Sequence, residues 1–279
     1  MIAFLNGNFV AEADAVVPLN DRGFLLGDGL FETMRVAGGR PFRLGQHLER
    51  LVRGAEFCQI KLPLPLRDLQ KFIAELIRQN GLPDAVLRIT LTRGPGARGY
   101  SIQGADRPTL AMTLHPLPGQ TSEEPLQWSL ITSAFRIPAS DTLASFKSTS
   151  RILHVLARAE AEAQGADEAL LLNTNGEATE TAGGNLFWIY QDKICTVPTG
   201  RGGLPGITRA VVLEICHALG LETNKRVIKP EALRNSRGIF VTQSALGIVP
   251  ISAFDGEPVE PSPLVDQIAR AYHEMLMKG

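Results

Sequence analysis

The sequence predicts a mixed α/β protein built of two domains. Segments with apolar residues three or four positions apart, typical of helices, are interspersed with short segments that alternate as strands do. One stretch, residues 116–125, has three prolines and no periodicity, which is typical of a domain boundary. We therefore expect an N-terminal domain over residues 1–115, a linker over 116–125 and a C-terminal domain over 126–279.

The first elements are a hairpin and a glycine-rich loop. Asn6-Gly7 stands between two short apolar runs and suits the positive φ angles of a tight hairpin turn. The loop N-D-R-G-F-L-L-G-D-G then leads into an alternating strand that ends at Val36. Glycine allows a backbone to approach a ligand closely, so this loop is either part of a binding site or a plain connection.

The rest of the first domain reads as two helices followed by two strands. Apolar spacing predicts a helix over residues 44–59, with Arg50 and Arg53 off the apolar line, and a second helix that stops at Gly81. The strands are separated by the loop R-G-P-G-A-R-G-Y, which carries Arg93 and Arg98. The expected ranges of the second helix and the strands are 66–80, 85–92 and 109–114.

The second domain alternates strands and helices. Asn175-Gly176 predicts another hairpin turn, and Gly206-Ile207-Thr208 opens a helix that stops at Gly220. A last helix closes the chain after a turn at Asp255-Gly256. The expected strands are 126–132, 168–173, a segment ending at Tyr190, 226–228, 238–242 and 249–254, with a further helix over 152–164.

Composition excludes several classes of function. The 279 residues include 28 basic and 29 acidic side chains, so neither nucleic acid nor an anionic membrane is an expected partner. Three widely spaced cysteines give neither a disulfide framework nor a zinc site, which favours the cytoplasm. No apolar run reaches the roughly 18 residues of a membrane span. The five histidines lack ligand-like spacing, so we expect structural or surface roles for them and no metal.

Lys147 is the candidate nucleophile among the seven lysines. It lies in S-F-K-S-T-S-R just before a helix, with no charged neighbour on its N-terminal side for several residues. A lysine in a dry site loses affinity for its proton, and its amine can then form a Schiff base with a carbonyl compound. A solvated surface lysine is the alternative at this point.

Other residues form a candidate anion site. The N–H groups at the helix start, Ile207 and Thr208, favour an anion, although Thr208 is equally well placed to cap the helix. Ser244, after a strand, and Arg50 would add further donors. A Schiff-base lysine with such a phosphate site is what pyridoxal 5′-phosphate requires, and Glu180 is a candidate carboxylate beside the pyridine nitrogen.

Several motifs occur in a set order along nearly the whole chain. They are D-R-G-F-L-L-G-D-G-L-F-E-T, H-L-E-R-L, R-G-P-G-A-R-G-Y, the lysine, A-D-E-A-L-L-L-N-T-N-G-E-A-T-E-T-A-G-G-N-L-F-W, L-P-G-I-T-R and T-Q-S-A-L-G-I-V-P-I. This order resembles the fold-type IV pyridoxal phosphate enzymes, the class IV aminotransferase family. The resemblance implies two domains, the smaller α+β and the larger β-barrel-like, with the cofactor in the cleft between them, and a homodimer.

By motif, the resemblance also assigns roles to residues. It implies that Lys147 binds the cofactor covalently and that Glu180 pairs with the pyridine nitrogen. Arg98, helped by Tyr100, would bind a substrate carboxylate, with Arg93 as the alternative arginine. The residues implied for the phosphate are Arg50, Ile207, Thr208 and Ser244.

The same resemblance leaves the reaction open among members of the family. L-F-E-T-M-R-V, R-G-P-G-A-R-G-Y-S and S-A-L-G-I-V-P-I are most similar to 4-amino-4-deoxychorismate lyase, which gives 4-aminobenzoate and pyruvate for folate synthesis. However, K-S-T-S-R stands where these lyases usually have K-x-L-N-R, and Leu26 and Gln243 also depart from the pattern. The alternative is a transaminase for D-amino acids, and after these for branched-chain amino acids or (R)-amines, with an α-keto acid acceptor. A non-catalytic small-molecule binding protein is a minor third possibility.

Overall fold

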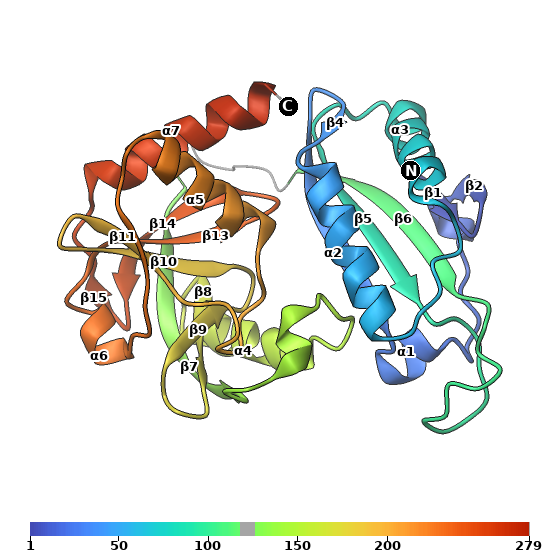
Figure 1. Ribbon diagram of the computed structural model, residues 1–279, viewed down its shortest axis with the longest axis horizontal. Helices are drawn as coiled ribbons and strands as arrows, with labels where there is room; N and C mark the ends of the chain where they lie inside the picture. The colour runs from blue at the N-terminus through green and yellow to red at the C-terminus, as the bar shows by residue number, and fades with distance from the viewer. Residues whose placement is uncertain (118–125, 279) are drawn as a thin grey trace. The chain divides into compact units, whose positions relative to one another are not determined.

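The computed structural model describes residues 1–117 and 126–278. Residues 1–117 and Phe146–Ser150 form one compact unit, and residues 126–145 and Arg151–Lys278 form the other. Each unit contains one large β-sheet with helices packed on it (Figure 1), which confirms the mixed α/β class. Most of the expected linker, residues 118–125, lies outside the described residues.

The first unit is built on an antiparallel sheet with the strand order β2-β1-β6-β5-β3-β4. The expected hairpin is confirmed, because Asn6 and Gly7 have φ angles of 49° and 97° and join the first two strands. Along β3 and β5, buried and half-buried residues alternate, so one face of this sheet belongs to the core. The strands are β1 (Ile2–Leu5), β2 (Asn8–Ala11), β3 (Gly29–Ala37), β4 (Arg40–Pro41), β5 (Ala85–Thr92) and β6 (Thr109–Pro116).

Two helices, α2 (Leu44–Phe57) and α3 (Leu66–Asn80), cover that buried face. Their apolar residues pack with those of the strands into one core, and α3 ends at Gly81, whose φ of 62° suits a helix C-terminus. One expectation about α2 is wrong. Arg50, which the apolar spacing places off the buried line, is only 5% exposed.

The glycine-rich loop contains a short helix, α1 (Arg22–Leu26), which the sequence did not predict. Asp21 caps it by accepting a hydrogen bond from the N–H of Gly23 at 2.7 Å, and Gly27 ends it in the left-handed conformation. Five residues are too few to show a helical period, so only the capping residues in the sequence indicate this helix. A 3-10 turn, η1, spans Glu12–Asp14.

The segment Phe146–Ser150 pairs with β3. The N–H of Phe31 donates to the carbonyl of Lys147 at 2.8 Å, and the N–H of Thr149 donates to the carbonyl of Gly29 at 2.9 Å. The hydroxyls of Thr149 and Ser150 both donate to the carbonyl of Gly27, at 2.8 and 3.2 Å. The sequence-based ranges 1–115 and 126–279 treat each domain as continuous, whereas this pairing attaches five later residues to the first unit.

The second unit contains a larger sheet with the strand order β12-β11-β10-β13-β14-β7-β8-β9, and β15 pairs with β14. β9 turns directly into β10 through a hydrogen bond from the N–H of Thr181 to the carbonyl of Gly184, so the sheet curls back on itself. Its strands are β7 (Trp128–Ile137), β8 (Glu168–Asn173), β9 (Ala178–Thr181), β10 (Asn185–Tyr190), β11 (Lys193–Thr196), β12 (Thr223–Lys225), β13 (Arg237–Gln243), β14 (Gly247–Phe254) and β15 (Glu257–Pro258).

Helices cover this sheet on its outside. α4 (Ile152–Ala163) packs on β7 and β8, whereas α5 (Ile207–Ala218) and α7 (Pro263–Lys278) pack on each other and on β13. The remaining short helices are η2 (Thr142–Ser145) and α6 (Pro230–Leu233). The strand expected over 226–228 is wrong, since the chain pairs with β11 three residues earlier, as β12. Nowhere in the described ranges is a helix long and apolar enough to cross a membrane.

Candidate active site

Lys147 is held in place through its backbone. The pairing with β3 described above fixes its carbonyl, and its ammonium group lies 4.6 Å from the centroid of the Phe31 ring. The Arg88 guanidinium lies 4.0 Å from the centroid of the same ring. Phe31 alternates with the buried residues Leu30 and Glu32, so Lys147 stands on the sheet face opposite α2 and α3. The half-buried lysine is thus set beside an aromatic ring and a second cation.

The other face of β3 carries a buried charged cluster, Glu32–His47–Arg50. Glu32 accepts hydrogen bonds from Arg50 at 2.8 and 2.7 Å and one from Nδ1 of His47 at 2.7 Å. The three side chains are between 1% and 5% exposed. Arg50, the expected phosphate ligand, is therefore oriented by a carboxylate that no sequence motif singled out. Its contact with Glu32 also explains why this arginine faces inward.

In the cluster, the pKa of the Glu32 carboxyl and the pKa of His47 are both lowered, for different reasons. Burial alone would raise the pKa of the Glu32 carboxyl, but hydrogen bonds from Arg50 and His47 outweigh burial and leave the pKa below its ordinary value. Burial lowers the pKa of His47 and outweighs the hydrogen bond and charge of Glu32, which raise it, while the positive charges of Arg50 and Lys147 lower it further. A neutral His47 can donate from Nδ1 to Glu32, which agrees with the short contact between them.

In the second unit, Glu180 lies on β9 and is 5% exposed. One of its carboxylate oxygens accepts a hydrogen bond from the backbone N–H of Leu204 at 2.7 Å, and the other lies 3.1 Å from Nε2 of His154 on α4. Arg151 approaches the same histidine nitrogen at 3.2 Å. The carboxylate can only accept and Arg151 can only donate, so Nε2 of His154 serves one of these two partners at a time. The expected role of Glu180 thus falls to a fixed, buried carboxylate, and His154 is a partner that sequence reasoning missed.

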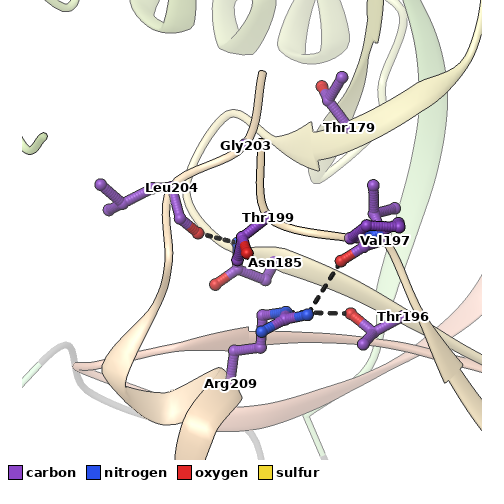
Figure 2. A pocket seen from close by; sticks show the side chains of 9 residues that line it. Thr179, Asn185, Thr196, Val197, Thr199, Gly203, Leu204 and Arg209 are labelled. Atoms are coloured by element: carbon purple, nitrogen blue, oxygen red, sulfur yellow. Dashed lines mark hydrogen bonds between the residues drawn. The ribbon is translucent and has the colours of Figure 1, made fainter. Parts of the chain in front are cut away.

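The backbone that contacts Glu180 continues into the start of α5. Asn185, the first residue of β10, donates to the carbonyl of Leu204 at 2.8 Å (Figure 2). A Cβ atom on Gly206 would lie 1.9 Å from Oδ1 of the same asparagine, so only glycine fits there without rearrangement. Asn185 therefore holds the loop 203–206 against the sheet.

The N-terminus of α5 matches the expected anion site. Gly206 caps the helix without any side-chain hydrogen bond, and Ile207 and Thr208 are both buried. The N–H groups of a first helical turn have no partner within the helix and attract anions. Asn185 pairs with Thr242 on β13, two residues before Ser244, so the turn after β13 lies near this helix start. The structure therefore brings together Glu180, Ile207, Thr208 and Ser244.

A small pocket lies next to the start of α5, and it is too small to hold the cofactor. It has a volume of about 10 Å³, enough for one water molecule. Buried Arg209 borders it and donates to the carbonyl of Val197 at 2.9 Å and to the hydroxyl of Thr196 at 3.3 Å (Figure 2). The last residue of the motif L-P-G-I-T-R thus ties α5 to the end of β11.

Arg98 and Tyr100 lie on an exposed loop of the first unit, and Tyr100 is 89% exposed. Arg93, the other candidate for a substrate carboxylate, is 6% exposed and donates twice to Asp28 and to two backbone carbonyls. Four of its five N–H groups are therefore used within the protein. The geometry favours Arg98 as the arginine that is open to a substrate.

The candidate residues of each unit can be compared with what one cofactor requires. An amine on a backbone-fixed lysine, a buried carboxylate and a helix N-terminus are the three features that pyridoxal 5′-phosphate needs for its aldehyde, its pyridine nitrogen and its phosphate. The chain belongs to the family "Amino-transferase class IV", whose model matches residues 29–254. Members of this family depend on pyridoxal phosphate, so the chain is a pyridoxal phosphate enzyme, as the sequence predicts.

Curated relatives cover almost the whole chain. A Methanocaldococcus jannaschii protein with the provisional name branched-chain-amino-acid aminotransferase is 33% identical over 93% of this chain and 90% of its own. The D-alanine aminotransferase of Bacillus licheniformis is 27% identical over 99% of this chain and 98% of its own. The aminodeoxychorismate lyase of Bacillus subtilis is 29% identical over 90% of this chain and 86% of its own.

Solved structures agree with this assignment. The branched-chain amino acid aminotransferase of Escherichia coli superposes with a TM-score of 0.94 at 25% identity, over 99% of this chain and 95% of its own. A Legionella pneumophila chain provisionally named 4-amino-4-deoxychorismate lyase gives a TM-score of 0.87 at 27% identity, over 95% of this chain and 97% of its own. The expected fold and family are confirmed, and the chain is a transaminase or lyase of this family.

Proposed function

We propose that the protein is a transaminase that moves an amino group from an α-amino acid to an α-keto acid. The observation that carries this proposal is the similarity to branched-chain aminotransferases, which reaches 33% identity in sequence and a TM-score of 0.94 in structure. The departure of K-S-T-S-R from the lyase pattern points the same way. In the structure, Thr149 and Ser150 of this segment bind the carbonyl of Gly27 through their hydroxyls.

The chain's residues take the following parts in this reaction. The cofactor, when bound, accepts the electron pair that the substrate Cα releases. Lys147 removes the proton from that Cα with its Nζ atom, a step typically worth about 10²–10⁴ in rate. Glu180 keeps a proton on the pyridine nitrogen. Arg98, helped by Tyr100, binds the substrate carboxylate, and the phosphate is bound by Arg50, Ile207, Thr208 and Ser244.

The second candidate is 4-amino-4-deoxychorismate lyase, favoured by the motifs L-F-E-T-M-R-V and S-A-L-G-I-V-P-I and by the Bacillus subtilis relative. It would use Lys147 for the same proton, but the enolpyruvyl group would leave and the ring would become aromatic. Such a lyase needs no keto acid. Among transaminase substrates, the branched-chain L-amino acids come first, and D-alanine follows from the Bacillus licheniformis relative.

One experiment separates these activities. The purified holoenzyme is mixed with L-leucine, D-alanine or L-glutamate alone, and the keto acid formed is measured after quenching. A transaminase releases one equivalent of keto acid per bound cofactor and stops. With L-leucine or D-alanine as the donor, it resumes when 2-oxoglutarate is added. A lyase gives no keto acid from these donors but produces pyruvate from 4-amino-4-deoxychorismate over many turnovers, and that result would replace the transaminase proposal.

We also propose that the protein is a homodimer. Val17, Leu19 and Phe24 are 76%, 81% and 71% exposed and border a pocket of about 300 Å³ on the first unit. Large apolar side chains gathered at a surface are typical of an interface. Analytical ultracentrifugation should give twice the mass of the 30.2 kDa chain, and Leu19→Glu should shift the protein toward the monomer. A wild-type monomer at micromolar concentration would refute the proposal.

A further inference from the structure

The loop between β5 and β6 carries Arg98 and Tyr100 and contains no helix or strand. It is closed at its base, where Gly94 has a φ of 81° and a Cβ atom there would lie 1.8 Å from the carbonyl of Arg107. A loop of this length must find partners for its backbone carbonyls or leave them to solvent. The partner that the structure supplies is a side chain from α1.

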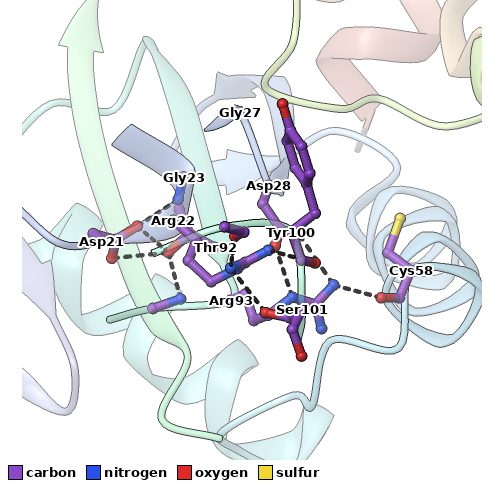
Figure 3. A network of polar contacts seen from close by, with 12 residues as sticks. Asp21, Arg22, Gly23, Gly27, Asp28, Cys58, Thr92, Arg93, Tyr100 and Ser101 are labelled. Carbon is purple, nitrogen blue, oxygen red and sulfur yellow. Dashed lines mark hydrogen bonds and ion pairs between the residues drawn. The ribbon is translucent and has the colours of Figure 1, made fainter. Parts of the chain in front are cut away.

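Arg22 reaches into this loop and binds three consecutive carbonyls (Figure 3). Its guanidinium donates to Gly99 at 2.9 Å, to Ser101 at 3.0 Å and to Tyr100 at 3.3 Å. The side chain is 3% exposed. A Cβ atom on Gly96 would lie 2.8 Å from its Cδ atom, so the methylene groups of Arg22 also pack against the loop backbone.

Asp28 fixes the direction of Arg22. One carboxylate oxygen accepts from Nε of Arg22 at 2.8 Å, and both oxygens accept from Arg93 at 2.8 and 3.0 Å. Burial would raise the pKa of Asp28, but the hydrogen bonds from both arginines hold the pKa below its ordinary value. Arg93 continues to the carbonyls of Cys58 and Gln59 at the end of α2, both at 2.7 Å (Figure 3). The loop is thus connected to the helix that carries Arg50.

We propose that Arg22 is a positioning residue that sets the location of Arg98 and Tyr100 and thereby the affinity for the substrate carboxylate. The inference rests on the proposed substrate role of Arg98. Only a planar fork can bind Asp28 through Nε and three carbonyls through its other nitrogens, so lysine cannot replace arginine here. Arg22 is buried and bonded to Asp28 and to the loop backbone, so its effect on the substrate would pass through the loop.

The first test does not depend on activity. Trypsin can cut this loop after Arg98, whereas Arg107 precedes Pro108 and resists cleavage. We expect Arg22→Met and Arg22→Lys to raise the rate of cleavage between Arg98 and Gly99 about tenfold or more, measured as fragments 1–98 and 99–279 by mass spectrometry. Arg67→Met, which removes an arginine that is 81% exposed, is the matched control and should leave this rate unchanged.

The second test is kinetic. In the holoenzyme, Arg22→Lys should raise KM for the substrate about tenfold and change kcat less than about threefold, at unchanged cofactor content. In an Arg98→Met background the same change should have little further effect on KM, because the two residues act on one contact. If Arg22→Met fails to fold, Arg22→Lys serves both tests.

The outcomes are distinguishable. Unchanged trypsin cleavage, or faster cleavage with an unchanged KM, overturns the positioning role of Arg22. If Arg98→Met itself leaves KM unchanged, the proposed role of Arg98 is refuted. The positioning role of Arg22, which rests on it, is then overturned too. Proteolysis in that case still shows whether Arg22 orders the loop. These results do not depend on whether the reaction is transamination or lysis, because KM is measured with whichever substrate is turned over.

Discussion

The candidate residues fall into two sets, one in each unit, and each half of the candidate residues is held in place in a different way. In the first unit, Arg50 is held by a buried network of charged side chains, Glu32 and His47, and Asp28 holds two further arginines. In the second unit, Glu180 and the anion site depend mainly on the backbone, through the N–H of Leu204, the glycine at position 206 and the start of α5. Charge pairing organises one half, and backbone conformation organises the other.

This difference predicts how each half fails. A buried ion pair that loses one partner leaves an uncompensated charge, which is strongly destabilising. A backbone site keeps its donors after most side-chain changes but is disrupted when a Cβ atom is added where none fits. Neutralising substitutions should therefore damage the first half, and glycine substitutions should damage the second.

The largest effect on activity should come from substitutions of Lys147, the candidate nucleophile. Lys147→Ala should lower kcat/KM by more than about 10⁴-fold, since covalent attachment of the cofactor is lost together with the proton transfer. Lys147→Arg keeps the positive charge but lacks the nucleophilic amine, and it should be as inactive. Turnover is measured with the substrate identified as above, and a Lys147→Ala rate close to that of the wild type would disprove the assignment.

The next largest effect tests the half built on charge. Glu32→Gln leaves Arg50 buried without its ion pair, and we expect the free energy of unfolding of the apoprotein to fall by about 3–5 kcal/mol. Urea denaturation followed by far-ultraviolet circular dichroism measures this loss. Glu75→Gln removes an exposed carboxylate that also pairs with an arginine, Arg78, and it should have no measurable effect. Equal effects of the two substitutions would contradict the role given to burial.

The half built on backbone is tested with Gly206→Ala. The new Cβ atom would collide with the side-chain amide of Asn185, so either the loop shifts or the amide moves and gives up its hydrogen bond to the carbonyl of Leu204. Either change loosens the loop 203–206 that leads into α5. We expect cofactor affinity to fall about 10- to 100-fold, in line with roughly 1–3 kcal/mol for overpacking. Titration of the apoprotein with pyridoxal phosphate gives the dissociation constant. Gly45→Ala in α2, where a Cβ atom meets nothing within 4 Å, is the control.

Periodicity in the sequence was enough to predict most of the fold. The helices α2 and α3 and the hairpin at Asn6-Gly7 follow from local patterns of apolar residues and turn residues, which act over a few positions. The pairing of Phe146–Ser150 with β3 could not be predicted in this way. It joins residues more than a hundred positions apart through backbone hydrogen bonds, which leave little trace in side-chain pattern.

The candidate site was predictable only in part. Lys147, Glu180 and the start of α5 stand in motifs, and the structure shows how the backbone holds each of them. Their roles stay predictions. Their supporting residues were missed for a physical reason. Glu32 sits in an alternating strand and His47 on an amphipathic helix, and nothing in either pattern shows that the two side chains meet.

The smallest expected effect is a pH dependence of stability that comes from His47 in the first unit. Because the pKa of His47 is lower in the folded protein than its usual value, the unfolded chain binds more protons as the pH falls. The contribution of His47 to the free energy of unfolding is therefore fully present above about pH 6.5, the ordinary pKa of histidine. It is lost progressively as the pH falls toward the pKa of the folded state, by at most about 1.4 kcal/mol per pH unit for one proton. The pKa of the Glu32 carboxyl is also lowered, but its contribution to the free energy of unfolding is lost only in more acidic solution, where carboxylates take up protons.

His47→Gln should remove this contribution, so the difference in unfolding free energy between wild type and variant should change between pH 8 and pH 5 in the apoprotein. His115→Gln, at an exposed histidine, should run parallel to the wild type over the same range. Urea denaturation at each pH measures all three proteins. If His47→Gln keeps the wild-type slope, burial does not lower the pKa of this histidine in the folded protein, and the prediction is wrong.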